Sequence, residues 1–490
     1  MATERIPLTQ PIESRDGTFT KDSYSSNCVF ETRDQKREFI KRPGLVLATQ
    51  ITPVTPPAST PSQGLANFNN KIISVINNTV YTTDPTTYVT ATVGTTSAST
   101  SQSYFVRTFL DAYLFMHNKV NAYLYTLAGS FAVVTDPDFP AAPYVSGIVF
   151  LDNYVFIGTG TNRIYNSDLG DPTSWNALNY LTFEQTTDTL VGIVKHLNYL
   201  VAMGKTSMQF FYNAGNATGS PLSVAQAYTS EVGCANGDSI VSTTNTVIWI
   251  GTTRTHGRSV YLMDGVSPVK ISTDSVDKHL EADDMSKVTA YCYKFNGHTL
   301  YILTLHNINQ TLVFDIDEKM WYTWTQYAMA SNDQPNPGTY VESYFRPSFY
   351  AEVNNVPYVL DDDTANLYYF STGVYQDNGQ PIYCRTVTDI IDNGVTKRKF
   401  YGRLEIIGDK VAGTMQVRHS GDDYKTWSSY RSVDLNASRP QVYLSGSDRR
   451  RAWEFLVTSN VPLRLDGAEI DFRIGEMDQE QQVGGGRYRR

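Results

Sequence analysis

Residues 288–325 contain four short β-strand patterns in succession, each separated from the next by turn-forming residues. The first is rich in aromatic and β-branched residues and ends at Asn296-Gly297, which supplies the two positive-φ positions of a tight hairpin turn. The second is apolar on both faces, which is typical of a strand covered by sheets on both sides. The four patterns span 288–295, 298–305, 311–315 and 321–325. Four antiparallel strands joined in this way predict one blade of a β-propeller.

The apolar second strand of this unit, with the turn and third strand that follow it, recurs along the chain. The recurrences are separated by roughly 40 to 60 residues, a spacing typical of propeller repeats with loop insertions. They start at Lys71, Tyr113, Tyr154, Tyr199, Val247, Leu300 and Tyr358. We therefore predict an all-β protein with a β-propeller over residues 65–375, with seven blades or alternatively six.

The remaining regions differ from the blade pattern. Residues 1–64 are expected to be an N-terminal arm followed by a linker rich in Pro, Ser and Thr, and 376–478 a C-terminal β-sandwich, because its strand patterns alternate apolar and polar residues. Residues 479–490 are expected to be a flexible basic tail, either disordered or docked on a partner. Its candidate partner contacts are Arg487, Arg489 and Arg490. One helix is expected at 273–282, with Asp274 available to cap its free N–H groups.

Composition excludes several functional classes. The formal net charge is −9, which disfavours a protein that binds nucleic acid through a basic face. The four cysteines have no metal-binding or disulfide spacing and are expected to be core residues. No apolar run is long enough to cross a membrane, and the N-terminus lacks a signal-peptide pattern, so we expect no membrane anchor.

The chain carries no recognisable catalytic, cofactor-binding or metal-binding motif. It lacks the glycine-rich loops that bind nucleotides, the HExxH zinc motif and the GxSxG nucleophile motif. Two acidic runs, Asp361–Asp363 and Asp315 with Asp317 and Glu318, do not have the spacing of a calcium loop. We interpret both as polar turns, and we expect no catalytic residue, cofactor or metal.

The segment 420–427 resembles an Asp-box, a hairpin turn held by an aspartate that bonds to the turn's own backbone. The matching residues are Ser420, Asp422, Thr426 and Trp427, whereas Tyr424 stands where the box has glycine. Asp-boxes recur in sialidases, as structural turns away from the catalytic pocket. The match, with the abundance of Tyr and Trp, leaves open an alternative function as a carbohydrate-binding or glycosidase propeller that recognises a receptor.

A longer series of motifs resembles the packaged-DNA stabilisation proteins, the tail hub or nozzle of short-tailed bacteriophages. The motifs occur in the family's order at 42–44, 166–175, 247–251, 271–273, 297–305, 311–315 with Trp321, and 449–455. The resemblance implies a non-enzymatic structural protein of the virion tail, assembled in the cytoplasm of the bacterial host.

The resemblance also implies a quaternary arrangement and a set of partners. Six subunits would form a ring below the portal and its adaptor protein, with the tail needle, fibres or spikes below or around it. This ring would form the DNA exit channel and help to retain the packaged genome. From the net charge of −9 we further expect double-stranded DNA to pass through the ring without tight binding.

Overall fold

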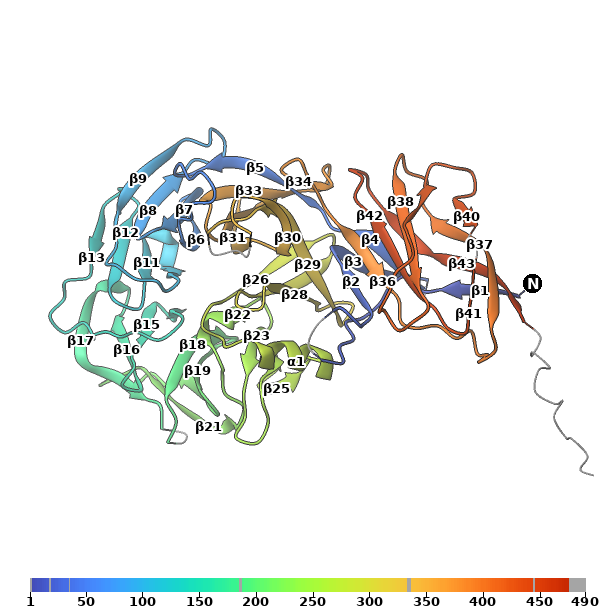
Figure 1. Ribbon diagram of the computed structural model, residues 1–490. Helices are drawn as coiled ribbons and strands as arrows, with labels where there is room; N and C mark the ends of the chain where they lie inside the picture. Colours follow the sequence, from blue (N-terminus) through green and yellow to red (C-terminus); the bar gives the residue numbers. More distant parts are fainter. Residues whose placement is uncertain are drawn as a thin grey trace, which may run out of the picture. The chain divides into compact units, whose positions relative to one another are not determined.

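The computed structural model describes residues 2–16, 19–34, 36–184, 187–332, 336–443 and 446–475. Their regular secondary structure consists almost entirely of β-strands (Figure 1). They form two compact units, one of Pro43–Ile382 and one that combines Met1–Arg42 with Tyr383–Arg490. Among the described helices, none has the length and apolar character needed to cross a membrane.

The larger unit is a β-propeller. Six four-stranded blades are each formed by consecutive strands, and a seventh combines three consecutive strands with a strand from the N-terminal part of the chain. Blade 1 contains β6 (Ser62–Phe68), β7 (Lys71–Ile76), β8 (Thr79–Thr83) and β9 (Thr90–Thr95). Blade 2 contains β10 (Tyr104–Arg107), the short 3-10 helix η1 (Phe109–Asp111), β11 (Tyr113–His117), β12 (Ala122–Thr126) and β13 (Phe131–Val133).

The next three blades follow the same meander. Blade 3 contains β14 (Val149–Leu151), β15 (Tyr154–Gly158), β16 (Arg163–Asp168) and β17 (Asp171–Thr182). Blade 4 contains β18 (Leu190–His196), β19 (Tyr199–Gly204), β20 (Met208–Asn213) and β21 (Leu222–Ser230). After the 3-10 helix η2 (Gly237–Ser239), blade 5 contains β22 (Val241–Ser242), β23 (Val247–Gly251), β24 (Ser259–Asp264) and β25 (Ser267–Lys270).

The last two blades close the ring. Blade 6 contains β26 (Val288–Phe295), β27 (His298–Leu305), β28 (Gln310–Asp315) and β29 (Met320–Met329), which also pairs with β30 (Tyr340–Tyr344). Blade 7 contains β31 (Pro347–Val353), β32 (Val356–Asp361), β33 (Asn366–Ser371) and β5 (Gly44–Gln50). The short strands β34 (Gln376–Asp377) and β35 (Gln380–Pro381) extend this sheet beyond β5.

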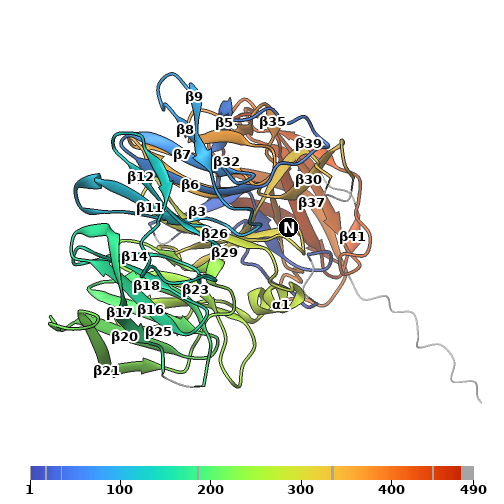
Figure 2. The same cartoon turned by 90° about the vertical axis from the view of Figure 1, so that its left-hand side faces the viewer.

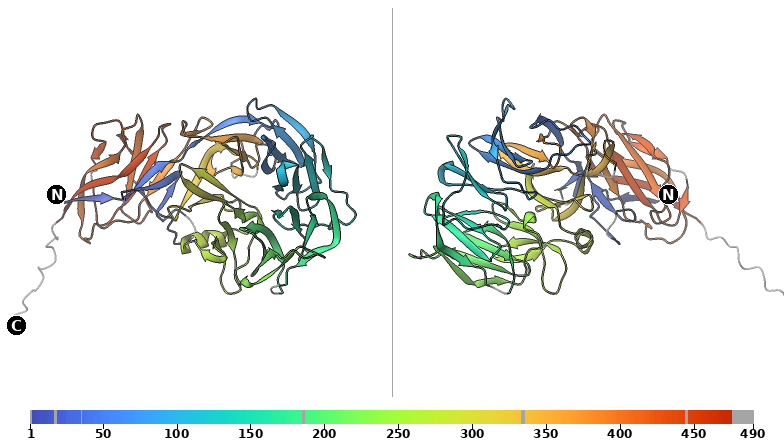
Figure 3. Two further views of the ribbon diagram at one scale, coloured as in Figure 1. Left: turned by 180° about the vertical axis from the view of Figure 1, so that it is seen from behind. Right: turned by 60° about the vertical axis from the view of Figure 1, so that its left-hand side comes forward.

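The inner strands of the seven blades form a closed circle. Each inner strand contacts the inner strand of the next blade, and β31 of blade 7 contacts β6 of blade 1. Figure 1 and the left view of Figure 3 show the blades around a common axis, and Figure 2 shows blades 1 to 4 stacked side by side. All seven second strands expected from the sequence lie where predicted, from β7 to β32.

The cores of the propeller lie between neighbouring blades, because both faces of each sheet carry apolar residues. One cluster joins Phe156 of blade 3 to Leu200 and Phe211 of blade 4, and another joins Ile72 of blade 1 to Leu360 of blade 7. The propeller therefore contains a series of radial cores, and each core depends on two adjacent blades.

Truncation of a side chain in β27 tests this packing. Ile302 is fully buried in the central part of blade 6. Ile302→Ala is expected to lower the free energy of unfolding by about 2–5 kcal/mol, because it removes buried methylene groups and leaves a cavity. Chemical denaturation followed by tryptophan fluorescence measures the loss, and an unchanged transition would show that this strand is not part of a core.

The single α-helix of the described residues, α1 (Asp274–Ala282), connects blades 5 and 6. Val276 and Leu280 are fully buried, as the four-residue spacing of these apolar side chains predicts. The cap differs from the expectation, since Thr273 rather than Asp274 accepts the hydrogen bond from the Val276 N–H.

The smaller unit consists of two β-sheets. One contains β1 (Ala2–Ile6), β3 (Cys28–Arg33), β4 (Lys36–Lys41), β37 (Lys399–Gly408), β40 (Gln441–Tyr443), β41 (Ser447–Asp448) and β43 (Arg464–Ile474). The other contains β2 (Tyr24–Ser26), β36 (Cys384–Val387), β38 (Thr414–Ser420), β39 (Arg431–Asp434) and β42 (Ala452–Val457). Tyr401 of the first sheet packs edge-on against Trp453 of the second at 6.0 Å, so the two sheets share a core.

The expected domain boundaries need correction. Residues 1–64 are not a separate arm and linker, because β1 to β4 pair with C-terminal strands and β5 completes blade 7. The β-sandwich accordingly begins at Tyr383 and includes Met1–Arg42. The expected tail at 479–490 lies outside the described residues.

Candidate functional site

The axis of the propeller holds a polar cavity of about 270 Å³. Its lining comes from blades 1, 2, 6 and 7 and from the segment between blades 4 and 5. Lys119, Asp238, Lys287 and Asp362 contribute two positive and two negative charges to the wall. A concave site with convergent polar groups is the first place to look for chemistry in a protein of this kind.

Asp238 is the centre of one side of this cavity. It lies in η2, where the Asn236 side chain accepts a hydrogen bond from the Asp238 N–H at 2.7 Å. The Asp238 carboxylate binds Lys119 Nζ at 2.7 Å and accepts a hydrogen bond from Ser146 Oγ at 2.9 Å. The Tyr104 hydroxyl also donates to it. One carboxylate thus links the segment before blade 5 to blade 2 and to the segment before blade 3.

Burial shifts the pKa values of two groups near Asp238, Tyr104 and His117. The pKa of Tyr104 lies well above its usual value, first because the phenol is buried and second because Asp238 is negative. Burial also lowers the pKa of His117 to about 4, so its imidazole is neutral at pH 7. Its Nε2 lies 3.0 Å from the Gly147 carbonyl oxygen. These groups stay in one protonation state near neutral pH, which fits a structural role for the cluster.

Asp362 belongs to a second polar cluster, around Arg346. This guanidinium is 1 % exposed and lies 3.2 Å from Asp361 and 3.4 Å from Asp362, and it also pairs with Asp363. The Asp361 carboxylate further accepts hydrogen bonds from the backbone N–H groups of Asp363 and Thr364. Burial raises the pKa of Asp361, while the charge of Arg346 lowers it.

The three aspartates of this cluster could offer carboxylate oxygens to a cation, since their ligand atoms lie within 4.8 Å of one another. The Arg346 guanidinium already bonds to all three carboxylates. We therefore interpret the run as a buried ion cluster that joins the start of blade 7 to its β32–β33 turn.

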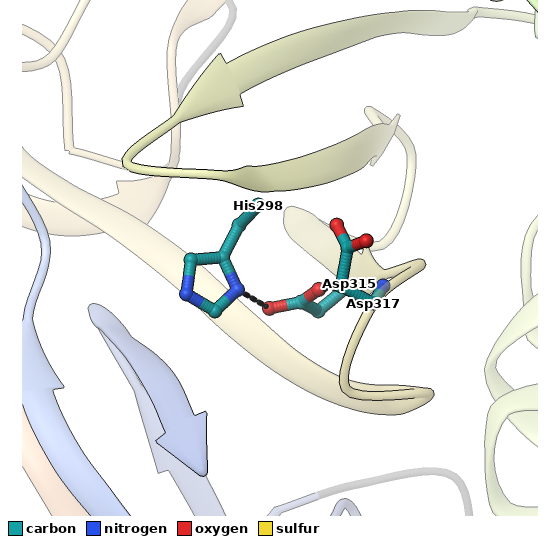
Figure 4. A group of neighbouring side chains, drawn as sticks. All are labelled: His298, Asp315 and Asp317. Carbon is teal, nitrogen blue, oxygen red and sulfur yellow. Dashed lines mark hydrogen bonds and ion pairs between the residues drawn. The ribbon is translucent and has the colours of Figure 1, made fainter. Parts of the chain in front are cut away.

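His298, Asp315 and Asp317 form a second group with metal-binding residue types (Figure 4). His298 Nδ1 lies 2.8 Å from Asp315 Oδ2, and Asp315 Oδ1 accepts the backbone N–H groups of Asp317 and Glu318. Asp317 accepts the Thr299 N–H at 2.7 Å. The Asp315 carboxylate closes the β28–β29 turn, and both Asp315 and Asp317 connect this turn to β27. These contacts agree with our interpretation of the acidic run as a polar turn.

The His298–Asp315 contact makes a testable contribution to stability. Asp315 raises the pKa of His298, so the contact stabilises the fold fully below the unfolded pKa of histidine, about 6.5, and less as the pH rises through the folded value. The stability difference between wild type and His298→Gln is expected to be larger at pH 5.5 than at pH 8.5, by up to about 1 kcal/mol. Thermal melts at the two pH values measure it. A difference that grows toward alkaline pH would contradict this assignment.

The Asp-box-like segment lies in the smaller unit, between β38 and β39. The Asp422 carboxylate accepts hydrogen bonds from the Thr426 N–H at 2.9 Å, from Thr426 Oγ1 at 2.6 Å and from Ser420 Oγ at 2.9 Å. The hydrogen bonds from Thr426 are the largest cause of an Asp422 pKa lowered to about 2. Trp427 lies beside Tyr424 and under the Arg418 guanidinium. Every polar contact of Asp422 serves the turn itself.

Sequence reasoning found the aspartates of the Arg346 cluster but missed Arg346 and Asp238. The hairpin centred on Asn354-Asn355 pairs Pro347 with Asp361, so its register could have placed Arg346 beside the acidic run. Asp238 has no such local signal, because its partners come from blades that are distant in sequence. Arg487, Arg489 and Arg490 lie outside the described residues.

The family of the chain follows from its sequence over the propeller. A family model described as Bacteriophage P22 Gp10, beta-propeller, matches residues 5–375. The chain belongs to this family. The resemblance to phage stabilisation proteins is thereby confirmed, and the P22 Gp10-like family is one of phage virion proteins.

Other comparisons add little to the family assignment. No curated protein matches the chain. A streptogramin B lyase is 10 % identical with a TM-score of 0.42, covering 67 % of this chain and 97 % of the lyase. BamB from Moraxella catarrhalis is 11 % identical with a TM-score of 0.37, covering 75 % of this chain and 100 % of BamB. The Neurospora crassa Pan2 WD40 domain is 11 % identical with a TM-score of 0.39, covering 67 % of this chain and 94 % of the domain. At these TM-scores the three structures carry no argument about this member of the P22 Gp10-like family.

Proposed function

We propose that this protein is a non-enzymatic subunit of a bacteriophage tail, and that six copies form a nozzle or hub below the portal and adaptor. The observation that carries the proposal is the match of residues 5–375 to the P22 Gp10-like family. The geometry of the polar clusters supports it, since Asp238, Arg346 and Asp315 bind groups of their own propeller. Such a ring would retain packaged DNA and guide it during ejection.

The proposal includes partners on both sides of the ring. The portal-adaptor protein would lie above it, and a tail needle, fibres or spikes would lie below or around it. Assembly in the host cytoplasm and residence in the virion tail follow from this position. We also propose that Arg487, Arg489 and Arg490 contact a neighbouring subunit or tail protein, because arginine suits carboxylate pairing across an interface.

Retention of DNA in phage particles tests the functional proposal. A phage that lacks this gene is propagated once in a host without the protein and once in a host that supplies it from a plasmid. Particles made without the protein are expected to package DNA and then lose it, whereas complemented particles keep it. Stable, DNA-filled particles without the protein would contradict the proposal.

Binding to duplex DNA is expected to be weak. The chain carries a formal net charge of −9, so an assembled ring repels the phosphate backbone at low ionic strength. Within the basic run Arg449–Arg451, Arg451 is 1 % exposed and pairs with Asp448, so its charge is not available to a phosphate group. A gel-shift titration at low salt is expected to show no binding at micromolar protein. Length-dependent binding in that range would show that the channel wall attracts DNA.

A further inference from the structure

Another polar pocket, of about 150 Å³, lies beside the strand that closes blade 7. Its wall comes from the end of β29, the start of β30, the β32–β33 turn and the hairpin of β34 and β35 (Figure 1). This hairpin contacts the closing strand β5, because the Asn378 N–H donates to the Leu45 carbonyl oxygen at 2.7 Å. A ligand in the pocket would therefore connect blade 7 to the segment that completes it.

Four buried aspartates lie in the wall of this pocket or directly behind it. They are Asp361, Asp362, Asp363 and Asp377, each at most 3 % exposed. Arg346 is the only fully buried lysine or arginine among the described residues of the propeller. Lys287 lies 3.6 Å from Asp362 but is 49 % exposed, and His306 Nδ1 lies 3.6 Å from the same carboxylate. Four negative charges thus face two positive ones, an excess of two, or of one when His306 is protonated.

The wall also carries uncharged oxygen ligands. The Thr364 side chain is 6 % exposed and lines the pocket, and its hydroxyl has no hydrogen-bond partner among the described residues. Asn366 donates through Nδ2 to the Tyr368 hydroxyl at 3.1 Å, so its Oδ1 remains available as an acceptor. Asn378 adds a further amide oxygen from the hairpin. These groups come from two separate segments of the chain.

We propose that this pocket binds a divalent hard cation of the Ca²⁺ class. Buried charges are stable when they are paired or coordinate a metal, and a double positive charge balances the excess of two. Hard cations take carboxylate, amide and hydroxyl oxygens as ligands. Neither cysteine nor histidine occurs among the described residues of the wall, which disfavours zinc.

Asp377 supplies the carboxylate to this cation, and Thr364 and Asn366 supply uncharged oxygens. Waters complete the coordination, since the pocket has the volume of about five water molecules. Asp361 remains bound to Arg346 at 3.2 Å. The acidic run 361–363 lacks the spacing of a calcium loop, and the further ligands come from a hairpin later in the chain, so no linear motif marks the site.

Terbium luminescence of the purified full-length protein tests this proposal. Tb³⁺ replaces Ca²⁺ at oxygen sites, and the tyrosines of the wall, Tyr327, Tyr340 and Tyr368, can sensitise its emission. Wild type is expected to give saturable emission at one equivalent per chain, and Ca²⁺ is expected to displace the terbium. Ca²⁺ is also expected to raise the melting temperature above that in EDTA, because it binds the folded chain.

Three variants locate the site. Asp377→Asn is expected to weaken terbium binding by at least about tenfold, because carboxylate charge sets the affinity for hard cations. Thr364→Val is expected to weaken it as well, and this variant keeps all four carboxylates if Asp377→Asn does not fold. The control is Asp317→Asn, which belongs to the other group of metal-binding residue types and is expected to bind terbium as wild type does.

The outcomes separate a specific site from general binding to surface acids. Emission that does not saturate, together with melting that is the same in Ca²⁺ and in EDTA, would overturn the proposal. Loss of binding in Asp317→Asn, with wild-type binding in Asp377→Asn and Thr364→Val, would also overturn it. The measurements use the purified protein alone, so their result does not depend on the proposed function in the tail.

Discussion

Leu45→Asp is expected to unfold the propeller or to lower its free energy of unfolding by at least about 4 kcal/mol. Leu45 is fully buried in β5, the strand that pairs with β33 and completes blade 7. The substitution places an unpaired carboxylate in an apolar environment and weakens the antiparallel pairing of β5 with β33, which joins the N-terminal segment to the last blade. Urea denaturation followed by circular dichroism measures the loss.

Leu47→Asp provides a matched control in the same strand. Leu47 is 37 % exposed, so its aspartate can remain in water, and the expected change is within about 1 kcal/mol. If the two variants lose the same stability, the effect comes from an acidic residue in β5 and not from the burial of Leu45. Closure of the ring by this strand would then lose its support.

Arg346→Met is expected to cost about 3–5 kcal/mol at pH 7.5, because it leaves three buried aspartates without their shared cation. Lys287→Met is the control. Lys287 lies 3.6 Å from Asp362, but its side chain is 49 % exposed, so the expected loss is below about 1 kcal/mol. Denaturation curves of the two variants give the comparison.

The pH dependence of Arg346→Met gives a second readout. Burial raises the pKa of Asp361 and Arg346 opposes this, so removal of Arg346 raises that pKa further. For a carboxyl group with a raised folded pKa, the stability is greatest below the unfolded pKa and is lost as the pH rises through the folded value. The loss in free energy of unfolding caused by Arg346→Met is therefore expected to be smaller at pH 4.5 than at pH 7.5. A loss of stability that becomes larger as the pH falls would show that the aspartates are not the destabilising groups.

Local patterns in the sequence were sufficient to predict the blades. An apolar strand such as 298–305, followed by a turn and a third strand, leaves a signal within about twenty residues, and all seven second strands were located in this way. The turns Asn296-Gly297 and Asn354-Asn355 fix their hairpins through residues that tolerate positive φ.

Pairing between distant segments could not be predicted in the same way. The strand Gly44–Gln50 reads as part of an arm, and nothing local indicates that it pairs with Asn366–Ser371. Likewise, nothing local indicates that the strand Cys28–Arg33 belongs to the β-sandwich. Asp238 was missed for a related reason, because its role depends on Lys119 and Tyr104 from another blade.

The copy number of this protein in intact particles tests the central proposal most directly. Quantitative mass spectrometry of purified virions, calibrated against the portal protein, gives that number. The proposed nozzle predicts six copies per particle, together with a six-fold density of propeller subunits below the portal in averaged images of the tail. Particles that contain none of the protein, or hold it away from the portal vertex, would contradict the proposal.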